Sequence, residues 1–208
     1  MAKKPLKDYP NIALREEDIK GKTDFSGVFG RSAPLHIEIG SGSGTFLVNQ
    51  ATAFGQINFL GIEWANKFYK YIVDRMGRRD VGNVRIIRTE AALFVSEHIK
   101  NNCVECFHIY FPDPWPKRSH HKRRFVSAKN VEQMIRCLKK NGLINIATDH
   151  AEYYQWMKNV FESFADKLKP VEFVKPAGTK NEELVGTNYE RKYMKEKRSV
   201  FTLAFKKT

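Results

Sequence analysis

Short apolar runs alternate with segments of helical periodicity from Leu35 to the end of the chain. Apolar runs of roughly four to eight residues bounded by turn residues are typical of buried strands, whereas apolar positions that recur every three to four residues indicate amphipathic helices. The pattern predicts strands at residues 35–39, 57–62, 83–87, 104–111, 143–147, 171–174 and 200–205. Most of these runs are separated by enough residues for a helix, which indicates repeated strand–helix units.

Helices are predicted between most of these strands. Residues 45–54 and 65–76 form the first two, and Gly77 can cap the second. The next helix starts after Ser127, ends at Asn141-Gly142, and carries a buried stripe of Val131, Met134, Ile135 and Leu138. A later helix carries an aromatic stripe formed by Tyr153, Trp156, Met157, Val160, Phe161 and Phe164. We interpret that stripe as core packing rather than as a platform for stacked bases.

Repeated β-α units followed by a strand pair predict an α/β fold with a mostly parallel, seven-stranded sheet and helices on both faces. Residues 1–33 are polar and basic with little periodicity, so they are expected to form a flexible N-terminal arm. The folded domain is then expected to span residues 34–208. Ligands of such sheets lie beyond the carboxyl ends of the strands, so functional side chains are expected there.

The composition narrows the possible functions. The chain has 208 residues, of which 42% are hydrophobic, and this suits one folded domain and excludes disorder throughout. Its formal net charge of +13 favours a polyanionic partner such as nucleic acid. Because no signal peptide or long apolar run is present, we expect a soluble, cytoplasmic protein that needs no membrane.

The cysteines indicate neither a disulfide framework nor a metal centre. Cys103 and Cys106 form a C-x-x-C pair, but no second pair completes a zinc site. Cys106 also lies in an apolar strand run. Both residues are interpreted as ordinary buried or half-buried thiols, and no metal is expected.

A glycine-rich turn, Gly40-Ser-Gly-Ser-Gly44, links the first predicted strand to a helix. Such a unit binds nucleotides, because glycine lets the backbone approach the ligand. The dinucleotide fingerprint would require glycine at Thr45, so a nicotinamide cofactor is disfavoured. With Glu38 on the strand, the turn resembles the first motif of class I S-adenosylmethionine-dependent methyltransferases. Glu63, at the end of the next strand, is placed to accept hydrogen bonds from ribose hydroxyls.

Further candidates follow the later strands. The strand at 104–111 runs into Phe111-Pro-Asp-Pro-Trp-Pro, whose prolines end the strand and hold Asp113 and Trp115 in a stiff turn. The basic residues after it can bind phosphates and are Lys117, Arg118, Lys122, Arg123 and Arg124. Trp115 either packs the loop or touches a base. Glu90 either contacts an adenine or complements the dipole of a following helix.

Together these motifs resemble the bacterial-type tRNA (guanine-N7)-methyltransferases, in the family's order, from about Leu35 to the C-terminus. The matching segments are Ile37-Glu-Ile-Gly-Ser-Gly-Ser-Gly44, Gly61-Ile-Glu63, Phe111-Pro-Asp-Pro-Trp-Pro-Lys117, Thr148-Asp149 and Gly186-Thr-Asn-Tyr-Glu190. The resemblance implies a class I methyltransferase fold. It also implies methyl transfer from S-adenosylmethionine to guanine N7 at position 46 of the tRNA variable region, with S-adenosylhomocysteine as the second product.

The same resemblance implies roles for individual residues. The implied donor-binding set is Glu38, Gly40, Gly42, Gly44, Glu63, Glu90 and Asp113. Glu90 departs from the family pattern, which often has Asp or Asn there. The implied substrate-binding set is Lys117, Asp149, Thr187, Asn188, Tyr189 and Glu190, to which the basic run adds phosphate contacts. The implied partner is tRNA. No obligatory protein partner is expected, and the protein is expected to be a monomer or a homodimer.

The chemistry of guanine agrees with this reading. Neutral guanine carries a lone pair on N7, so methylation needs alignment and no general base. The methylated ring is cationic, and Asp113 and Asp149 are candidate catalytic residues that could stabilise it and accept hydrogen bonds from its N1–H and 2-amino group.

Three other functions stay open from the sequence. An exocyclic-amine methylase would carry a second proline where Trp115 stands. A methyltransferase for another RNA keeps the same donor motif. A non-catalytic RNA-binding protein on this scaffold would not need Glu38 and Glu63.

Overall fold

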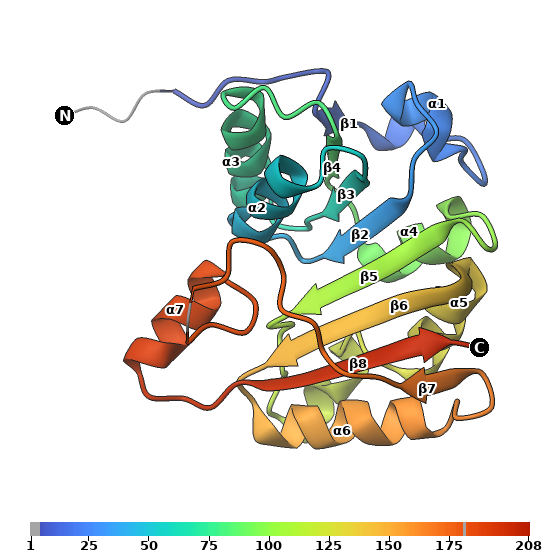
Figure 1. Cartoon of the computed structure of the whole chain (residues 1–208), viewed down its shortest axis with the longest axis vertical. Helices are drawn as coiled ribbons and strands as arrows, with labels where there is room; N and C mark the ends of the chain where they lie inside the picture. The colour runs from blue at the N-terminus through green and yellow to red at the C-terminus, as the bar shows by residue number, and fades with distance from the viewer. Residues whose placement is uncertain (1–4, 181) are drawn as a thin grey trace.

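The computed structural model describes residues 5–180 and 182–208. Within them the chain forms one eight-stranded sheet in the order β1-β4-β3-β2-β5-β6-β8-β7 (Figure 1). The strands are β1 (Ala13–Leu14), β2 (Leu35–Ile39), β3 (Asn58–Ile62), β4 (Val84–Ile87), β5 (Val104–Tyr110), β6 (Leu138–Thr148), β7 (Leu168–Pro170) and β8 (Phe201–Lys207). All pairs are parallel except those of β8, which runs antiparallel to β6 and β7. The predicted α/β class with a mostly parallel sheet is confirmed, but the sheet has eight strands rather than the predicted seven, because β1 pairs with β4 at its edge.

Helices cover both faces of this sheet (Figure 1). They are α1 (Phe25–Phe29), α2 (Thr45–Ala53), α3 (Asn66–Gly77), α4 (Ala91–His98), α5 (Ala128–Cys137), α6 (Ala151–Glu162) and α7 (Asn188–Lys195), with 3-10 turns η1 (Glu16–Asp18) and η2 (Arg118–Arg123). One buried cluster joins the sheet to α4, α5 and α6, and a second joins it to α2 and α3. Alternation along β2 sends Ile37 and Ile39 into the first cluster, so His36 and Glu38 face the α2 side.

The aromatic stripe of α6 packs into the core, as predicted. Tyr153, Met157 and Phe161 are almost completely buried. Trp156 is half-buried and donates its indole N–H to the carbonyl of Val126 at 3.0 Å. No helix among the described residues has both the length and the hydrophobicity needed to cross a membrane.

The N-terminal segment is more ordered than its composition indicates. Its first four residues lie outside the described residues. After them, β1 pairs with β4, and Ile12, Phe25 and Phe29 are buried against the sheet and its helices. A two-residue strand and a five-residue helix are too short to show periodicity, which is why the sequence pattern predicted only a loose arm.

One predicted strand and the end of one predicted helix were wrong. The strand expected at 171–174 is irregular backbone, and the edge strand β7 lies just before it. The helix expected to reach Asn141 ends at Cys137, and β6 starts at Leu138. Asn141 has φ of 65° inside β6, where the register with β5 shifts, so Asn141-Gly142 is an irregularity within a strand rather than a helix stop.

Gly61 on β3 leaves no room for a side chain. An added Cβ would lie 2.6 Å from Leu47 Cδ1 and 2.8 Å from Ile86 Cδ1. We expect Gly61→Ala to lower the free energy of unfolding by about 1–3 kcal/mol, because overpacking strains its neighbours. Gly82→Ala is the matched control, since a Cβ there meets nothing within 4 Å. Urea unfolding followed by circular dichroism measures both, and equal stabilities would contradict the packing.

Candidate active site

The glycine-rich turn connects β2 to α2 and is hydrogen-bonded to the carboxyl end of β3. Gly40 and Ser41 donate their backbone N–H groups to the carbonyl of Ile62 at 2.9 and 3.2 Å, so the turn leaves β2 across the end of β3. Gly42 then donates its N–H to Glu63 Oε2 at 2.8 Å. Gly40, Gly42 and Gly44 all have positive φ, a conformation that side chains disfavour. The turn is thus held against Glu63 by backbone hydrogen bonds.

Glu63 both stabilises this turn and faces other acids. Its Oε1 accepts the N–H of Ala65 at 2.8 Å. Burial raises the pKa of Glu63, and the negative charge of Asp113 raises it further. The charge of Asp113, on the loop after β5, therefore acts on the carboxylate of Glu63. The structure brings these two predicted donor-binding residues together.

Glu38 is buried, with 4% of its surface exposed. Within residues 5–180 and 182–208, its Oε2 and the neighbouring Ser41 Oγ are buried without a hydrogen-bond partner. Burial raises the pKa of Glu38 well above its usual range. A buried carboxylate oxygen without a partner is costly unless a ligand supplies a donor or a positive charge. The amino and hydroxyl groups of S-adenosylmethionine, the donor implied by the sequence, fit this requirement.

The start of α7 lies beside the glycine-rich turn. Asn188 Nδ2 donates to Ser43 Oγ at 2.9 Å. A Cβ on Gly42 would lie 3.2 Å from Cε2 of Tyr189. Burial raises the pKa of Tyr189, and the charges of Glu63 and Asp113 raise it further. Tyr189, which the sequence assigned to the substrate, therefore stands next to the predicted donor-binding residues.

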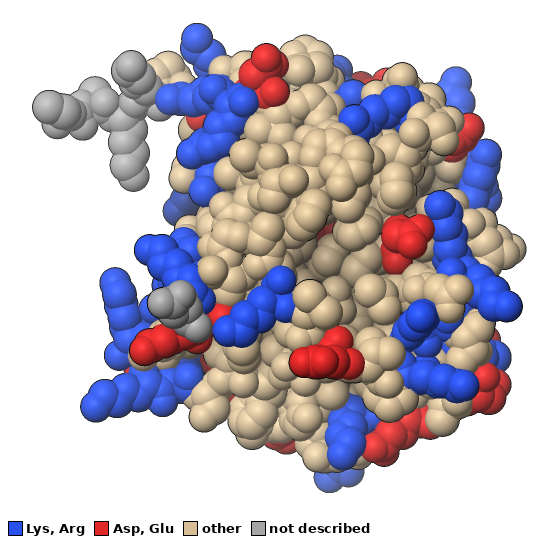
Figure 2. Space-filling view, viewed as in Figure 1, with Lys and Arg blue, Asp and Glu red and all other residues tan. Residues whose placement is uncertain are grey.

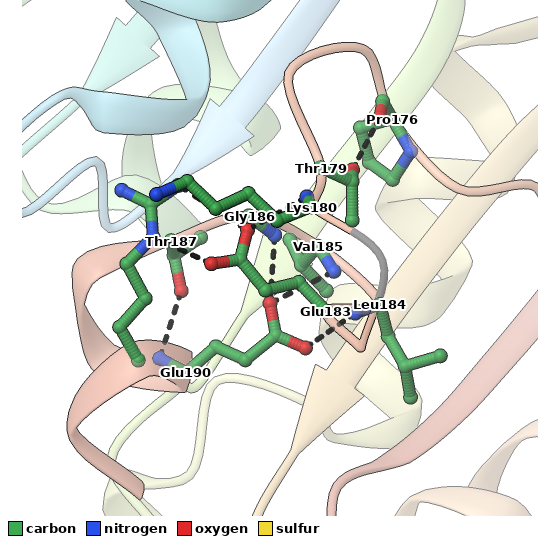
Figure 3. A network of polar contacts seen from close by, with 10 residues as sticks. Pro176, Thr179, Lys180, Glu183, Leu184, Val185, Gly186, Thr187 and Glu190 are labelled. Carbon is green, nitrogen blue, oxygen red and sulfur yellow. Dashed lines mark hydrogen bonds and ion pairs between the residues drawn. The ribbon is translucent and has the colours of Figure 1, made fainter. Parts of the chain in front are cut away.

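Glu190 and Thr187 hold the loop before α7 instead of facing solvent (Figure 3). The buried carboxylate of Glu190 accepts the backbone N–H groups of Leu184, Val185 and Gly186 at 2.5, 3.0 and 2.7 Å. Thr187 Oγ1 accepts the N–H of Glu190 at 3.1 Å and caps the helix. Both were predicted to bind substrate, yet the structure gives them backbone partners, so they position Asn188 and Tyr189.

Asp149, after β6, makes an ion pair that the sequence did not indicate. Its Oδ2 accepts a hydrogen bond from Arg198 Nη1 at 2.8 Å. The Asp149 side chain is 13% exposed, and that of Arg198 is 50% exposed. Arg198 follows α7 at a distance of 49 residues from Asp149 in sequence, and no local motif marks it. Sequence reasoning therefore missed this residue.

Arg124 differs from the other members of the basic run. Its side chain is buried, and its guanidinium donates to both carboxylate oxygens of Glu152, at 3.1 and 2.5 Å. It also donates to the carbonyl of Pro114 at 2.8 Å and lies over the ring of Tyr153. The prediction that Arg124 binds phosphate is corrected, because its donors are engaged inside the protein and fasten the Pro-Asp-Pro-Trp turn to α6.

The rest of the basic run is exposed. Lys117, Arg118, Lys122 and Arg123 lie on the surface of the loop. Arg123 stacks over Trp115 at 4.9 Å, and His120 packs edge-on against the same indole at 5.9 Å. In this structure Trp115 therefore packs the loop. Figure 2 shows further Lys and Arg side chains along the margin of the molecule where α3 and α7 lie.

Glu90 caps a helix. Its two carboxylate oxygens accept the N–H groups of Ala92 and Leu93 at 3.0 and 2.8 Å, at the start of α4. Of the two roles considered for Glu90, the structure shows the one at the N-terminus of a helix. An adenine contact by Glu90 stays a prediction.

Among the residues that the structure describes, one cluster could hold a metal ion. His36, Cys106 and His108 bring their ligand atoms within 4.8 Å of one another on the α2 face. In the structure His36 Nδ1 lies 3.1 Å from His108 Nε2, and His108 Nδ1 lies 2.9 Å from the hydroxyl of Tyr110. Burial lowers the pKa of His36 to about 4 and that of His108 well below its usual value, so both rings are neutral. A hydrogen-bonded chain of neutral groups accounts for this arrangement.

Comparisons with known proteins define the class first. Residues 32–203 match the family model described as "Putative methyltransferase". The solved structure of the 16S rRNA methyltransferase KamB has a TM-score of 0.64 at 13% identity and covers 91% of this chain and 95% of that one. A 30S ribosomal A1408 methyltransferase from an uncultured bacterium gives 0.60 at 15%, over 90% and 95%. The fold is that of the class I methyltransferases.

Sequence relatives then define the family. The tRNA (guanine-N(7)-)-methyltransferase of Alkalilimnicola ehrlichii is 33% identical over 202 residues, which are 96% of this chain and 83% of the relative. The enzyme of the same name from Streptococcus uberis is 29% identical, over 96% and 93%. This chain belongs to the tRNA (guanine-N(7)-)-methyltransferase family, and the resemblance found in its sequence is confirmed.

Arg124 should stabilise the fold rather than bind RNA. We expect Arg124→Met to lower the free energy of unfolding by about 1–3 kcal/mol, because it removes charged hydrogen bonds to Glu152 and Pro114. The Arg124 bond lowers the pKa of Glu152, so this part of the stability is present above roughly pH 4 and is lost as the pH falls further. Denaturant unfolding at pH 7 and pH 3 measures the difference.

Lys122→Met is the matched control, since Lys122 is exposed on the same loop. It should leave stability within about 0.5 kcal/mol of wild type. It should also flatten the salt dependence of RNA binding by about one unit of slope if Lys122 meets a phosphate. An Arg124→Met protein as stable as wild type would contradict the assignment.

Proposed function

We propose that this protein transfers a methyl group from S-adenosylmethionine to N7 of a guanine in tRNA, position 46 of the variable region. The observation that carries the proposal is the convergence of Glu38, Glu63 and Asp113 around the glycine-rich turn. Membership in the tRNA (guanine-N(7)-)-methyltransferase family supports it. A tRNA substrate accounts for the net charge of +13 and implies action in the cytoplasm.

The donor-binding residues suit a nucleoside that carries a charged amino acid through a sulfonium. When bound, the donor supplies an electrophilic methyl group on a sulfonium. Glu38 offers its unpaired Oε2 to the cationic amino acid end. Glu63 offers acceptors to the ribose hydroxyls while it holds Gly42. Asp113 adds a negative charge that acts on Glu63, and Tyr189 lies against the turn.

The substrate side of the site needs charge stabilisation and no base. Guanine N7 has no proton to lose, and the ring gains a positive charge on methylation. Asp149 lies at the end of β6, next to the strand whose loop carries Asp113. A carboxylate there accepts hydrogen bonds from guanine N1–H and the 2-amino group and stabilises the positive ring. Adenine has neither donor in that place, so the same contact favours guanine.

The exposed basic residues are the candidates for binding the phosphates of the RNA. Lys117, Arg118, Lys122 and Arg123 lie on the loop that carries Asp113, so a bound backbone would bring its base to the acids. Arg124 is excluded from this set because it is buried. Asn188 and Tyr189 remain candidates for substrate contact, because they lie against the glycine-rich turn.

The test is methyl transfer to a defined transcript. Purified protein, labelled S-adenosylmethionine and a tRNA with guanine at position 46 should give a product that borohydride and aniline cleave at that nucleotide, as N7-methylguanosine is cleaved. A transcript with adenine at position 46 is the control and should stay unmodified. Label on an exocyclic amine would favour the rival methylase. Tight tRNA binding without donor affinity or transfer would favour a non-catalytic RNA-binding protein.

Asp149 should act on the chemical step. We expect Asp149→Ala to slow single-turnover methyl transfer roughly 10²–10³-fold at saturating tRNA and donor, the scale of one preorganised electrostatic group. Asp149→Asn keeps one acceptor oxygen and should lose less. Donor affinity by isothermal titration should stay unchanged. Asp166→Asn, an exposed acid outside the site, is the control, and an Asp149→Asn enzyme at the wild-type rate would exclude the charge-stabilising role.

A further inference from the structure

Arg198 divides its guanidinium between two acids. Nη1 donates to Asp149 Oδ2 and Nη2 lies against Glu196 Oε2, each at 2.8 Å. The hydrogen bond to Asp149 raises the pKa of Arg198, so its charge is kept at all working pH values. Within the described ranges, Asp149 Oδ1 accepts no protein hydrogen bond, and this oxygen stays available to a substrate N–H.

The guanidinium of Arg198 packs on an aromatic platform formed by Tyr193 and Phe111. Its guanidinium carbon lies 4.8 Å above the ring of Tyr193 on α7. The Tyr193 ring lies 5.7 Å from Phe111, which ends β5 just before Asp113. Stacking and the ion pairs therefore restrain the arginine from two sides, unlike a solvated arm. Tyr193 lies on α7, the helix that carries Asn188 and Tyr189, and Phe111 begins the loop that carries Asp113.

We infer that Arg198 is a positioning residue that orients the carboxylate of Asp149 toward the guanine. The inference rests on the proposed function of Asp149. The terminal torsion of an aspartate is soft, so an Asp149 without a partner would sample several carboxylate orientations. Arg198 holds Oδ2 and leaves Oδ1 for the base. Small errors in such an alignment cost much of the rate, because catalysis depends on preorganised acceptors.

The orientation role predicts a loss in the chemical step. Arg198→Ala should slow single-turnover methyl transfer about tenfold at saturating tRNA and donor, with donor affinity unchanged. Arg198→Lys keeps the charge and one donor, so it should recover part of the rate. Tyr193→Phe preserves the platform ring and should match wild type, whereas Tyr193→Leu should lose rate in the same direction as Arg198→Ala.

A matched charge control separates orientation from phosphate binding. Lys195 is an exposed cation at the end of α7, and Lys195→Ala removes the same charge from the same segment. It should weaken tRNA binding and its salt dependence without changing the rate at saturation. If Arg198→Ala behaved in the same way, Arg198 would be a phosphate contact and the inference would be overturned.

A double-variant cycle tests whether Arg198 acts through Asp149. In the Asp149→Asn background, Arg198→Ala should cost little further rate, because the charged acceptor that it orients is gone. Rate losses that multiply would overturn the inference. Absence of N7-methylguanosine with the wild-type protein would instead refute the proposed function. Wild-type activity together with a full-rate Arg198→Ala protein would refute only the role of Arg198.

Discussion

Parallel pairing of the central strands is the constraint on which the site depends. Because β2 pairs in parallel with both β3 and β5, and β5 with β6, their carboxyl ends meet at one edge. The residues that follow these strands are therefore neighbours although they are far apart in sequence. Each strand end still has to be continued by a loop of fixed shape. Phe111 shows how this is done, because its N–H bonds to the carbonyl of Ala147 while its φ of 52° turns the chain away from the sheet.

The acidic residues at this edge fall into two groups, according to whether their carboxylate oxygens already accept backbone hydrogen bonds. Glu63 and Glu190 accept backbone N–H groups and so determine the shape of the glycine-rich turn and of the loop before α7. Glu38 and Asp149 keep an oxygen free for a ligand within the described residues. Carboxylates of the first kind are structural even at the ligand edge of the sheet, whereas those of the second kind have unused binding capacity. Glu63 belongs to the first group, because Gly42 and Ala65 donate to its two oxygens.

Sequence reasoning succeeded where a local pattern has one physical cause. The buried runs of the sheet and the stripe of α6 follow from burial, and the glycine-rich turn follows from backbone conformation. It failed where partners come from distant segments. In the sequence, Arg124 cannot be distinguished from its exposed basic neighbours. Its burial depends on its ion pair with Glu152 on α6, a residue far away in the sequence. The pairing of Asp149 with Arg198 has the same origin. The short elements β1, α1 and β7 contain too few residues to produce a period.

The positive charge of the chain therefore has two separate uses. Exposed cations attract a polyanion over a distance of about one Debye length, roughly 8 Å at physiological salt. Arg124, Arg191 and Arg198 are each paired with an acid inside the fold or at its edge, which offsets part of this attraction. These pairs fix the loops that carry Asp113, Tyr189 and Asp149. On the proposed function, non-specific affinity for RNA and the alignment of the base would depend on different arginines, and a count of basic residues would overstate the number of phosphate contacts.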